Sequence, residues 1–338
     1  MNKLRVFQNV TKRTASGFSI RNPGTVLLCP IRQLAKCAGV WFLLIPYIIT
    51  SLSGNMWSRD EKDISVIRKQ LKSGRYEVVN ETSLGKETLP LELYVADCLA
   101  RVMPEDFEME TLKAQAVLLR TNLIPEEGRI RTIVDEEYGK QEIPVRYLQA
   151  AAETLGVYLE YEGKPIYGAY FKVSSGSTRN GCEVLNTEEY PYLQEVLCDR
   201  DFLSAEYANV VTYTMREFEQ KWQLLDEMSS EFIDPSGEKR KEQCAGNLEL
   251  IRDSAGYVLG IKYKEKWVSG EQFRYEFHLP SADFRVSAQG DELVFDTKGA
   301  GHGLGMSQFG ANELALQGES YPEILEYFFQ GTHLTRVS

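Results

Sequence analysis

One glycine-rich stretch of the sequence has residue types and a spacing that suit ligand contact. Residues 299–311 read G-A-G-H-G-L-G-M-S-Q-F-G-A, with glycine at every second position from 299 to 305. If this run is extended, its four glycines fall on one face, because side chains alternate across a strand. A face of bare backbone can accept a second strand or a flat ligand such as a sugar ring, and it can equally be a closely packed joint without chemistry. His302 alone does not decide between these interpretations.

A second stretch combines hydroxyl side chains with a nearby aromatic residue. Residues 174–178 read S-S-G-S-T and follow a predicted strand that contains Tyr170. Sugars are bound by short polar side chains and backbone groups beside an aromatic platform, so this loop can line a carbohydrate site. The same composition is also that of an ordinary turn, and the sequence leaves both interpretations open.

Metal and cofactor chemistry is not expected. The chain has three histidines, His278, His302 and His333, and contains neither a C-x-x-C nor an H-E-x-x-H pattern. Zinc sites need several His, Cys or carboxylate ligands, which three histidines without such a pattern do not supply. We therefore predict no metal site, no cofactor and no zinc hydrolase.

The N-terminal segment differs in charge from the rest of the chain. Residues 1–36 hold seven Lys or Arg and no Asp or Glu, so the net charge of −11 leaves −18 for the remainder. An acidic body argues against nucleic acid as a partner, because phosphate binding needs clustered cations.

An uncharged stretch, 37–58, follows the basic segment. At about 20 residues it can cross a bilayer as a helix, and the Lys and Arg before it predict a cytoplasmic N-terminus. Residues from Arg59 onward would then lie outside the cytoplasm, at the cell membrane. The alternative is a cleaved secretory signal with small polar residues at 53–55, although the 36-residue leader is long for one. We favour the uncleaved single-pass anchor.

Outside the membrane the cysteines allow one disulfide. Cys182 and Cys198 both lie in the part of the chain expected there, and a bridge between them is allowed. Cys98 falls inside an apolar helical run, where a free cysteine behaves as a small buried hydrophobe.

Helix and strand signals are both plentiful in the rest of the chain, without a regular alternation. Helices are expected at 59–73, 89–103, 108–120, 145–155, 214–225, 308–317 and 322–329. Strands are expected at 76–80, 157–161, 166–173, 248–252, 257–263, 273–279 and 292–297. Glu162-Gly163 predicts a hairpin between two of these strands. This mixture predicts the α+β class, with antiparallel strands.

Residues 301–311 carry a resemblance to a known family. The string G-H-G-L-G-M-S-Q-F-G-A is similar to G-H-G-V-G-M-S-Q-Y-G-A, the signature of the stage II sporulation protein D and LytB amidase-enhancer family (SpoIID/LytB). Three further stretches agree in order, at 89–120, 154–178 and 191–193. The resemblance covers roughly residues 75–338.

The resemblance implies a domain with a groove between two lobes that acts on peptidoglycan in an endospore-forming bacterium. Members of the sporulation branch are lytic transglycosylases that cut glycan strands without stem peptides, together with an amidase and a membrane scaffold during engulfment. LytB-type members assist an amidase instead. The transglycosylase reaction needs one carboxyl group, which protonates the glycosidic oxygen and then accepts the proton of the sugar's own 6-hydroxyl.

At the catalytic position this chain departs from the family. Members carry a Glu directly before Met-Pro, and Val102 stands there in this sequence. Loss of an acid/base group lowers the rate by about 10²–10⁴-fold. Glu105 is the candidate for a displaced acid, although a solvated carboxylate at a helix N-terminus is the plainer interpretation. Two functions therefore stay open: a divergent transglycosylase that uses Glu105, and a glycan-binding or amidase-assisting protein without catalysis.

Domain boundaries follow from these elements and from the resemblance. We expect a basic cytoplasmic segment at 1–36, the anchor at 37–58, a linker at 59–88, a first lobe at 89–204, a helical charged connection at 205–247 and a strand-rich lobe at 248–338. The candidate glycan-binding residues are those of the two stretches described above: Tyr170, Ser174, Thr178, Gly301, His302, Gly303, Ser307 and Gln308.

Overall fold

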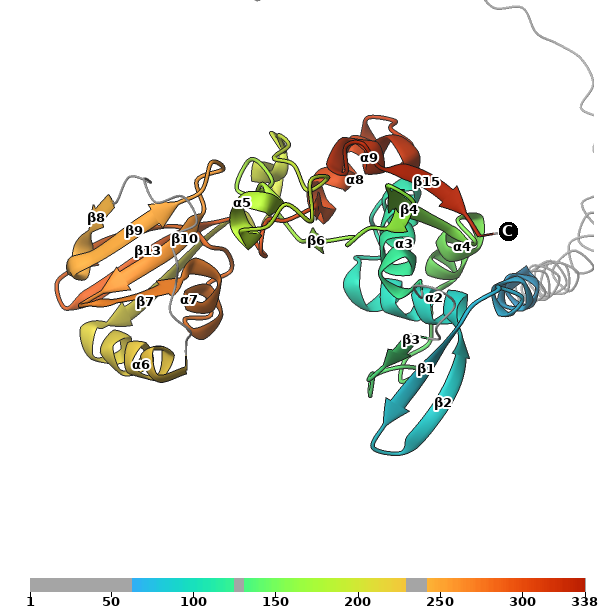
Figure 1. Cartoon of the computed structure of the whole chain (residues 1–338), viewed down its shortest axis with the longest axis horizontal. Helices are drawn as coiled ribbons and strands as arrows, with labels where there is room; N and C mark the ends of the chain where they lie inside the picture. The colour runs from blue at the N-terminus through green and yellow to red at the C-terminus, as the bar shows by residue number, and fades with distance from the viewer. Residues whose placement is uncertain (1–62, 125–130, 229–241, 338) are drawn as a thin grey trace, which may run out of the picture. The chain divides into compact units, whose positions relative to one another are not determined.

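The computed structural model describes residues 63–124, 131–228 and 242–337 (Figure 1). The basic segment 1–36, the expected anchor 37–58 and the first residues of the linker lie outside these ranges. Within them, no helix is long and apolar enough to cross a membrane. The described chain is a mixed structure of helices and antiparallel sheets, so the predicted α+β class is confirmed.

Three helices pack together in the first half of the described chain: α2 (Leu91–Val102), α3 (Met109–Leu123) and α4 (Val145–Glu153). Their core is lined by buried aliphatic side chains such as Val95, Leu99 and Leu112. α2 ends where predicted, because Met103 takes φ −119° and ψ 138°, the extended conformation that a following proline favours. A buried ion pair joins α3 to α2, with Arg120 Nη2 lying 2.6 Å from Glu92 Oε2.

Two small sheets contact these helices. In the first, β1 (Glu77–Thr82) pairs antiparallel with β2 (Gly85–Pro90) and parallel with β3 (Arg131–Ile133). In the second, β4 (Val157–Tyr161) pairs antiparallel with β5 (Lys164–Pro165) and β15 (His333–Arg336). Glu162 and Gly163 join β4 to β5 with φ values of 51° and 76°. The predicted hairpin turn is confirmed, and positive φ at both turn residues is the type I′ geometry that fits the twist of paired strands. The predicted strand at 166–173 is wrong for most of its length, because β5 ends at Pro165 and the strand within that range, Tyr170–Phe171, pairs with Met306–Ser307.

A strand-rich part follows, with two antiparallel sheets of strand orders β11-β10-β9-β8 and β12-β13-β7. These strands are β7 (Ala208–Thr214), β8 (Glu242–Cys244), β9 (Leu248–Arg252), β10 (Val258–Tyr263), β11 (Lys266–Ser269), β12 (Asp283–Gln289) and β13 (Glu292–Lys298). Two helices, α6 (Met215–Met228) and α7 (Gly270–Glu276), contact the strands (Figure 1). The core of this part is aromatic, with Phe218, Phe273, Phe277 and Phe295 all fully buried.

The predicted strand at 273–279 is wrong, because α7 occupies most of it. Its sequence alternates apolar and polar residues like a strand, but Phe273 and Phe277 lie four residues apart and face the same core. Their ring centroids are 4.1 Å apart. Ser269 starts the helix with a capping box, accepting from Gln272 N–H while the Gln272 side chain reaches back to Ser269.

The end of the chain returns to the first group of helices. α8 (Gln308–Leu316) and α9 (Tyr321–Phe328) contact α3, and β15 pairs with β4 (Figure 1). Ile324 and Phe328 of α9 share a buried cluster with Val117 and Leu118 of α3. The glycine-rich stretch therefore connects the last strand of the strand-rich part to helices that pack against α3.

Candidate functional site

The glycine-rich stretch is not a regular strand. Gly299, Gly301, Gly303 and Gly305 have φ values of 79°, 114°, 79° and 73°, in a region that residues with a side chain rarely adopt. Only its end forms a named strand, where β14 (Met306–Ser307) pairs in parallel with β6 (Tyr170–Phe171), and Ala300, Gly301 and Leu304 form isolated bridges. The expected run with one bare face is therefore wrong, because positive φ at every second residue breaks the alternation of a strand.

These glycines pack against residues 169–179 of the same chain. A Cβ atom on Gly305 would lie 2.2 Å from the carbonyl oxygen of Ala169, and the other three glycines meet that segment at 2.7 Å. Backbone hydrogen bonds hold the two segments together, with Ala300 N–H donating to the Val173 oxygen at 2.7 Å. Residues 169–179 therefore fill the space beside the four glycines, as in a closely packed joint, and a role of Gly301 and Gly303 in glycan binding stays a prediction.

His302 is used as a structural side chain. Its Nδ1 accepts a hydrogen bond from Leu304 N–H at 3.1 Å, and the ring also bonds the backbone of Tyr170. Burial lowers the pKa of His302 below its ordinary value, and the nearby Glu271 carboxylate only partly opposes this shift. Because a protonated ring has no acceptor nitrogen, the neutral form is the one that fits these bonds.

Ser174 and Ser307 meet at a buried carboxylate. Asp201 Oδ2 accepts from Ser174 N–H at 2.6 Å and from the Ser307 hydroxyl at 2.7 Å. Ser307 also caps α8, because its Oγ accepts from Gly310 N–H at 3.1 Å, so the predicted N-cap is confirmed. Burial raises the pKa of Asp201, while its hydroxyl and amide donors lower it. No sequence motif around Asp201 predicts that its carboxylate binds Ser174 and Ser307.

Thr178 is likewise bonded within the protein. Its hydroxyl donates to the Gln194 oxygen at 3.0 Å and accepts from Val196 N–H at 2.9 Å. Thr178 and Ser174 are both 0% exposed. The hydroxyl-rich loop therefore uses these two side chains to hold residues 174–201 together.

Gln308 brings the glycine-rich stretch to the end of α2. Its side-chain Nε2 donates to the Val102 carbonyl oxygen at 3.3 Å and to Gln115 Oε1 at 3.2 Å. Val102, Cys98 and Tyr170 are partly buried side chains that pack against the same core. Val102, the aromatic candidate Tyr170 and the end of the glycine-rich stretch thus lie in one region.

Carboxylates near this region are either buried in ion pairs or exposed in a turn. Asp97 is 1% exposed, lies 2.9 Å from Arg101 Nη2 and accepts from Gly139 N–H at 3.3 Å. Burial raises the pKa of Asp97, and Arg101 opposes that shift. Glu105 is exposed in the turn that follows Pro104. At position 102 itself the side chain is aliphatic and half-buried.

Comparison with known proteins identifies the family. A family model described as stage II sporulation protein matches residues 80–161. Stage II sporulation protein D of Bacillus subtilis (strain 168) is 32% identical over 275 residues, which cover 74% of this chain and 76% of that protein. The chain belongs to the stage II sporulation protein D (SpoIID) family.

Two further relatives show how far the similarity extends. Stage II sporulation protein D of Bacillus amyloliquefaciens is 31% identical, with 74% of this chain and 76% of that protein covered. The amidase enhancer of Bacillus subtilis (strain 168) is 26% identical over 69% of this chain and 39% of its own length. The SpoIID model region contains α2, α3, α4 and β4, and therefore Val102.

Sequence reasoning missed the ion network that holds the SpoIID glycine stretch to the strand-rich part. Arg179 is 1% exposed and donates to Asp253 Oδ2 at 2.5 Å, to Glu271 Oε1 at 2.9 Å and to the His302 oxygen at 3.2 Å. Its guanidinium also lies 4.9 Å from the ring centroid of Tyr257. Arginine is suited to this place because its planar fork can serve several acceptors at once.

The disulfide considered between Cys182 and Cys198 is not formed. Both residues are free thiols, as are Cys98 and Cys244. Cys182 lies in the short helix α5 (Gly181–Leu185), whereas Cys198 is buried in the core cluster with Tyr192 and Leu193. In the part of the chain that the structure describes, no group of three or more His, Cys, Asp or Glu is placed to hold a metal ion.

Proposed function

We propose that the protein is a cell-wall protein of sporulation that binds peptidoglycan glycan strands without cleaving them efficiently. One observation carries the proposal: at the position where the family has its acid, the side chain is Val102, held beside Gln308 of the family signature. Cleavage by a lytic transglycosylase needs a carboxyl that first gives and then takes a proton, and valine can do neither. Glu105 is exposed in the turn that follows Pro104.

The proposal includes a membrane anchor. Residues 37–58 would cross the cell membrane once, with the basic segment 1–36 in the cytoplasm and the described residues outside it. Glycan would then lie in a groove between two lobes, with Tyr170 and Val102 at its wall. The uncharged length of 37–58 and the positive charge before it support this arrangement.

Assistance to a cell-wall amidase is a second function that one comparison favours. The relative named amidase enhancer covers 69% of this chain. A protein that holds glycan strands without cutting them could present them to an amidase, together with a membrane scaffold of the sporulation machinery. Stimulation of a purified amidase on intact sacculi by this protein would support the role.

The test uses the full-length protein in detergent with purified sacculi and with glycan strands stripped of stem peptides. We expect the protein to sediment with sacculi and to release little or no anhydro-muramyl product from the stripped strands. Robust release that Glu105→Gln abolishes would overturn the proposal and establish a displaced acid. Failure to sediment with sacculi would contradict the glycan-binding role directly.

A further inference from the structure

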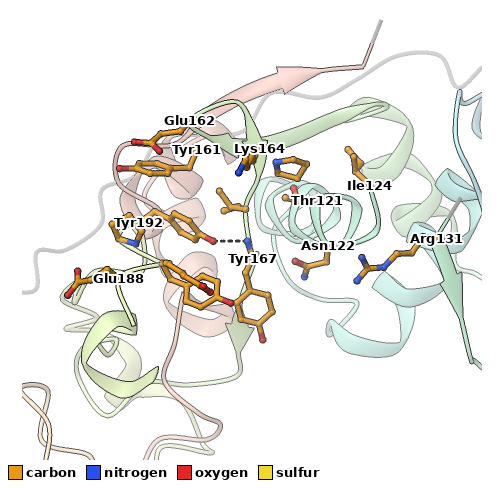
Figure 2. A pocket seen from close by; sticks show the side chains of 15 residues that line it. Thr121, Asn122, Ile124, Arg131, Tyr161, Glu162, Lys164, Tyr167, Glu188 and Tyr192 are labelled. Atoms are coloured by element: carbon orange, nitrogen blue, oxygen red, sulfur yellow. Dashed lines mark hydrogen bonds between the residues drawn. The ribbon is translucent and has the colours of Figure 1, made fainter. Parts of the chain in front are cut away.

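A cavity of about 890 Å³ lies at the C-terminal end of α3, between the β4–β5 hairpin and residues 188–192 (Figure 2). Ligand pockets in proteins commonly measure about 300–1,000 Å³. Gln308 bonds both Val102 and Gln115 of α3. Gln115 lies seven residues before Asn122, which lines this cavity. At about 1.5 Å per residue the cavity is therefore about 10 Å further along α3 than the region described above.

Four tyrosines line this cavity: Tyr161, Tyr167, Tyr190 and Tyr192. The ring centroids of Tyr161 and Tyr192 are 5.6 Å apart at 50°, and those of Tyr167 and Tyr190 are 6.0 Å apart at 59°. Tyr190 and Tyr192 meet edge to face, which joins the two pairs into one cluster. Tyrosine offers a broad apolar ring with few side-chain torsions to fix, so such a cluster binds flat ligands at low entropic cost.

The backbone presents Tyr167 rigidly even though its side chain is 50% exposed. Tyr167 N–H donates to the Tyr192 hydroxyl at 2.8 Å, and the Tyr167 oxygen accepts from Ala169 N–H at 3.0 Å. The next residue, Gly168, exchanges two hydrogen bonds with the Asn122 side chain, at 2.8 and 3.0 Å. An exposed aromatic ring on so firmly held a backbone is pre-organised for binding, because little freedom remains to be lost.

The charged residues of the cavity favour a neutral ligand. Glu162, Glu188 and Glu189 are exposed carboxylates, and Lys164 and Arg131 are exposed cations. Figure 2 shows Glu162, Glu188, Lys164 and Arg131 around the cavity. The three carboxylates outnumber the two cations and would repel a polyphosphate. The two cations would repel the positive charges of a basic peptide. A pyranose ring matches this lining, because its C–H face suits a tyrosine ring and its hydroxyls suit carboxylate and ammonium groups.

We propose that the cavity lined by Tyr161, Tyr167, Tyr190 and Tyr192 is a saccharide subsite that binds N-acetylhexosamine units of a glycan strand. This inference rests on the proposed function for the identity of the glycan. It places a contact for the strand away from Val102, at the far end of α3. Tyr167 and Tyr190 stack on the sugar, while the buried Tyr192 holds Tyr167 in place.

The experiment titrates the full-length protein, labelled with 3-fluorotyrosine, with the β-1,4-linked pentasaccharide of N-acetylglucosamine and follows ¹⁹F resonances. Resonances are assigned by Tyr167→Phe, Tyr190→Phe and Tyr275→Phe; Tyr275 is the control because it is 77% exposed on α7. We expect the Tyr167 and Tyr190 signals to shift and that of Tyr275 to stay. Tyr167→Ala should weaken binding about tenfold, or about 1.4 kcal/mol, and Tyr275→Ala should not.

Two outcomes overturn the inference: unmoved Tyr167 and Tyr190 signals at millimolar pentasaccharide, or shifts that Tyr275 shares equally. Sedimentation with sacculi is measured in parallel, so that the two proposals can fail separately. If the protein sediments with sacculi while the Tyr167 and Tyr190 signals do not move, the result supports the glycan-binding role and contradicts this subsite. If the Tyr167 signal moves but the protein does not sediment with sacculi, the result supports the saccharide subsite and contradicts the proposed cell-wall role.

Discussion

The side-chain amide of Gln308 donates a hydrogen bond to the carbonyl oxygen of Val102 at 3.3 Å, across 206 residues of sequence. This bond joins the last turn of α2 to the first turn of α8. It uses the backbone of residue 102 and is therefore independent of which side chain that residue carries. The contact between α2 and α8 at position 102 can therefore persist whether that residue carries a carboxyl or an aliphatic side chain.

Close packing of the glycine stretch predicts a large difference between two matched substitutions. Gly305 and Gly163 have nearly equal φ values of 73° and 76°, so alanine strains the backbone alike at both, by about 1–2 kcal/mol. A Cβ on Gly305 meets the Ala169 oxygen at 2.2 Å, whereas nothing lies within 4 Å of one on Gly163. We expect Gly163→Ala to fold with modestly reduced stability and Gly305→Ala to unfold or lose at least about 3 kcal/mol more.

Denaturant unfolding of the two variants measures this difference. Equal free energies of unfolding would show that the space around Gly305 is not filled by residues 169–179.

Sequence patterns were sufficient where local signals and packing agree. Pro104 ends α2, and the positive φ of Glu162 and Gly163 closes the β4–β5 hairpin as the turn residues predict. The prediction for residues 273–279 failed because Phe273, Tyr275 and Phe277 alternate with polar residues as in a strand. The signal that indicates the helix α7 is the capping box at Ser269, which lies before them. The positive φ of all four glycines in 299–305 cannot be read from the sequence, since glycine permits both signs of φ.

Candidate site residues were harder to predict than the elements that hold them. The spacing of Ser174, Thr178 and Ser307 gave no sign that their partners would be Asp201 and the backbone of residues 194–196. Such partners come from long-range contacts that a single sequence does not display. The proximity of residue 102 to the signature was predictable only through the family resemblance.

Titration of His302 predicts a pH dependence of stability. Burial lowers its pKa in the folded chain below the ordinary value of 6.5. At pH values between these two pKa values, the unfolded chain therefore binds more protons than the folded chain does. Stability is therefore full above about pH 6.5 and falls as the pH drops toward the folded pKa, where protonation breaks the bond from Leu304 N–H.

His302→Phe should remove this part of the pH dependence of stability, measured by denaturant unfolding between pH 7.5 and 5. His333→Phe is the control, because His333 is exposed in β15. An unchanged slope in His302→Phe would contradict the assignment.

The Arg179 network predicts strong coupling between the glycine stretch and the strand-rich part. Arg179→Met leaves Asp253, which is 7% exposed, without its cation, and such a loss costs about 3–5 kcal/mol. Asp253→Asn in the same chain removes the uncompensated charge and should restore part of the stability. Lys140→Met is the control, since Lys140 pairs with Glu137 where both side chains are exposed. Additive effects of Arg179→Met and Asp253→Asn in a double-mutant cycle would show that the pair is not coupled.

Restoring the missing acid gives the last prediction. Val102→Glu places a carboxyl in the half-buried, partly apolar region beside Tyr170, where desolvation raises its pKa toward the range useful for general acid catalysis. We expect this variant to release measurable anhydro-muramyl product from glycan strands without stem peptides, above the level of the unaltered protein. The gain should stay below the ~10²–10⁴-fold of an evolved acid, because no neighbouring groups orient the new carboxylate. Val210→Glu is the matched control, since Val210 is 65% exposed on β7 of the strand-rich part and adds the same charge there. Equal product from both variants would show that a carboxyl at position 102 has no catalytic advantage, and that more than the acid has been lost from this site.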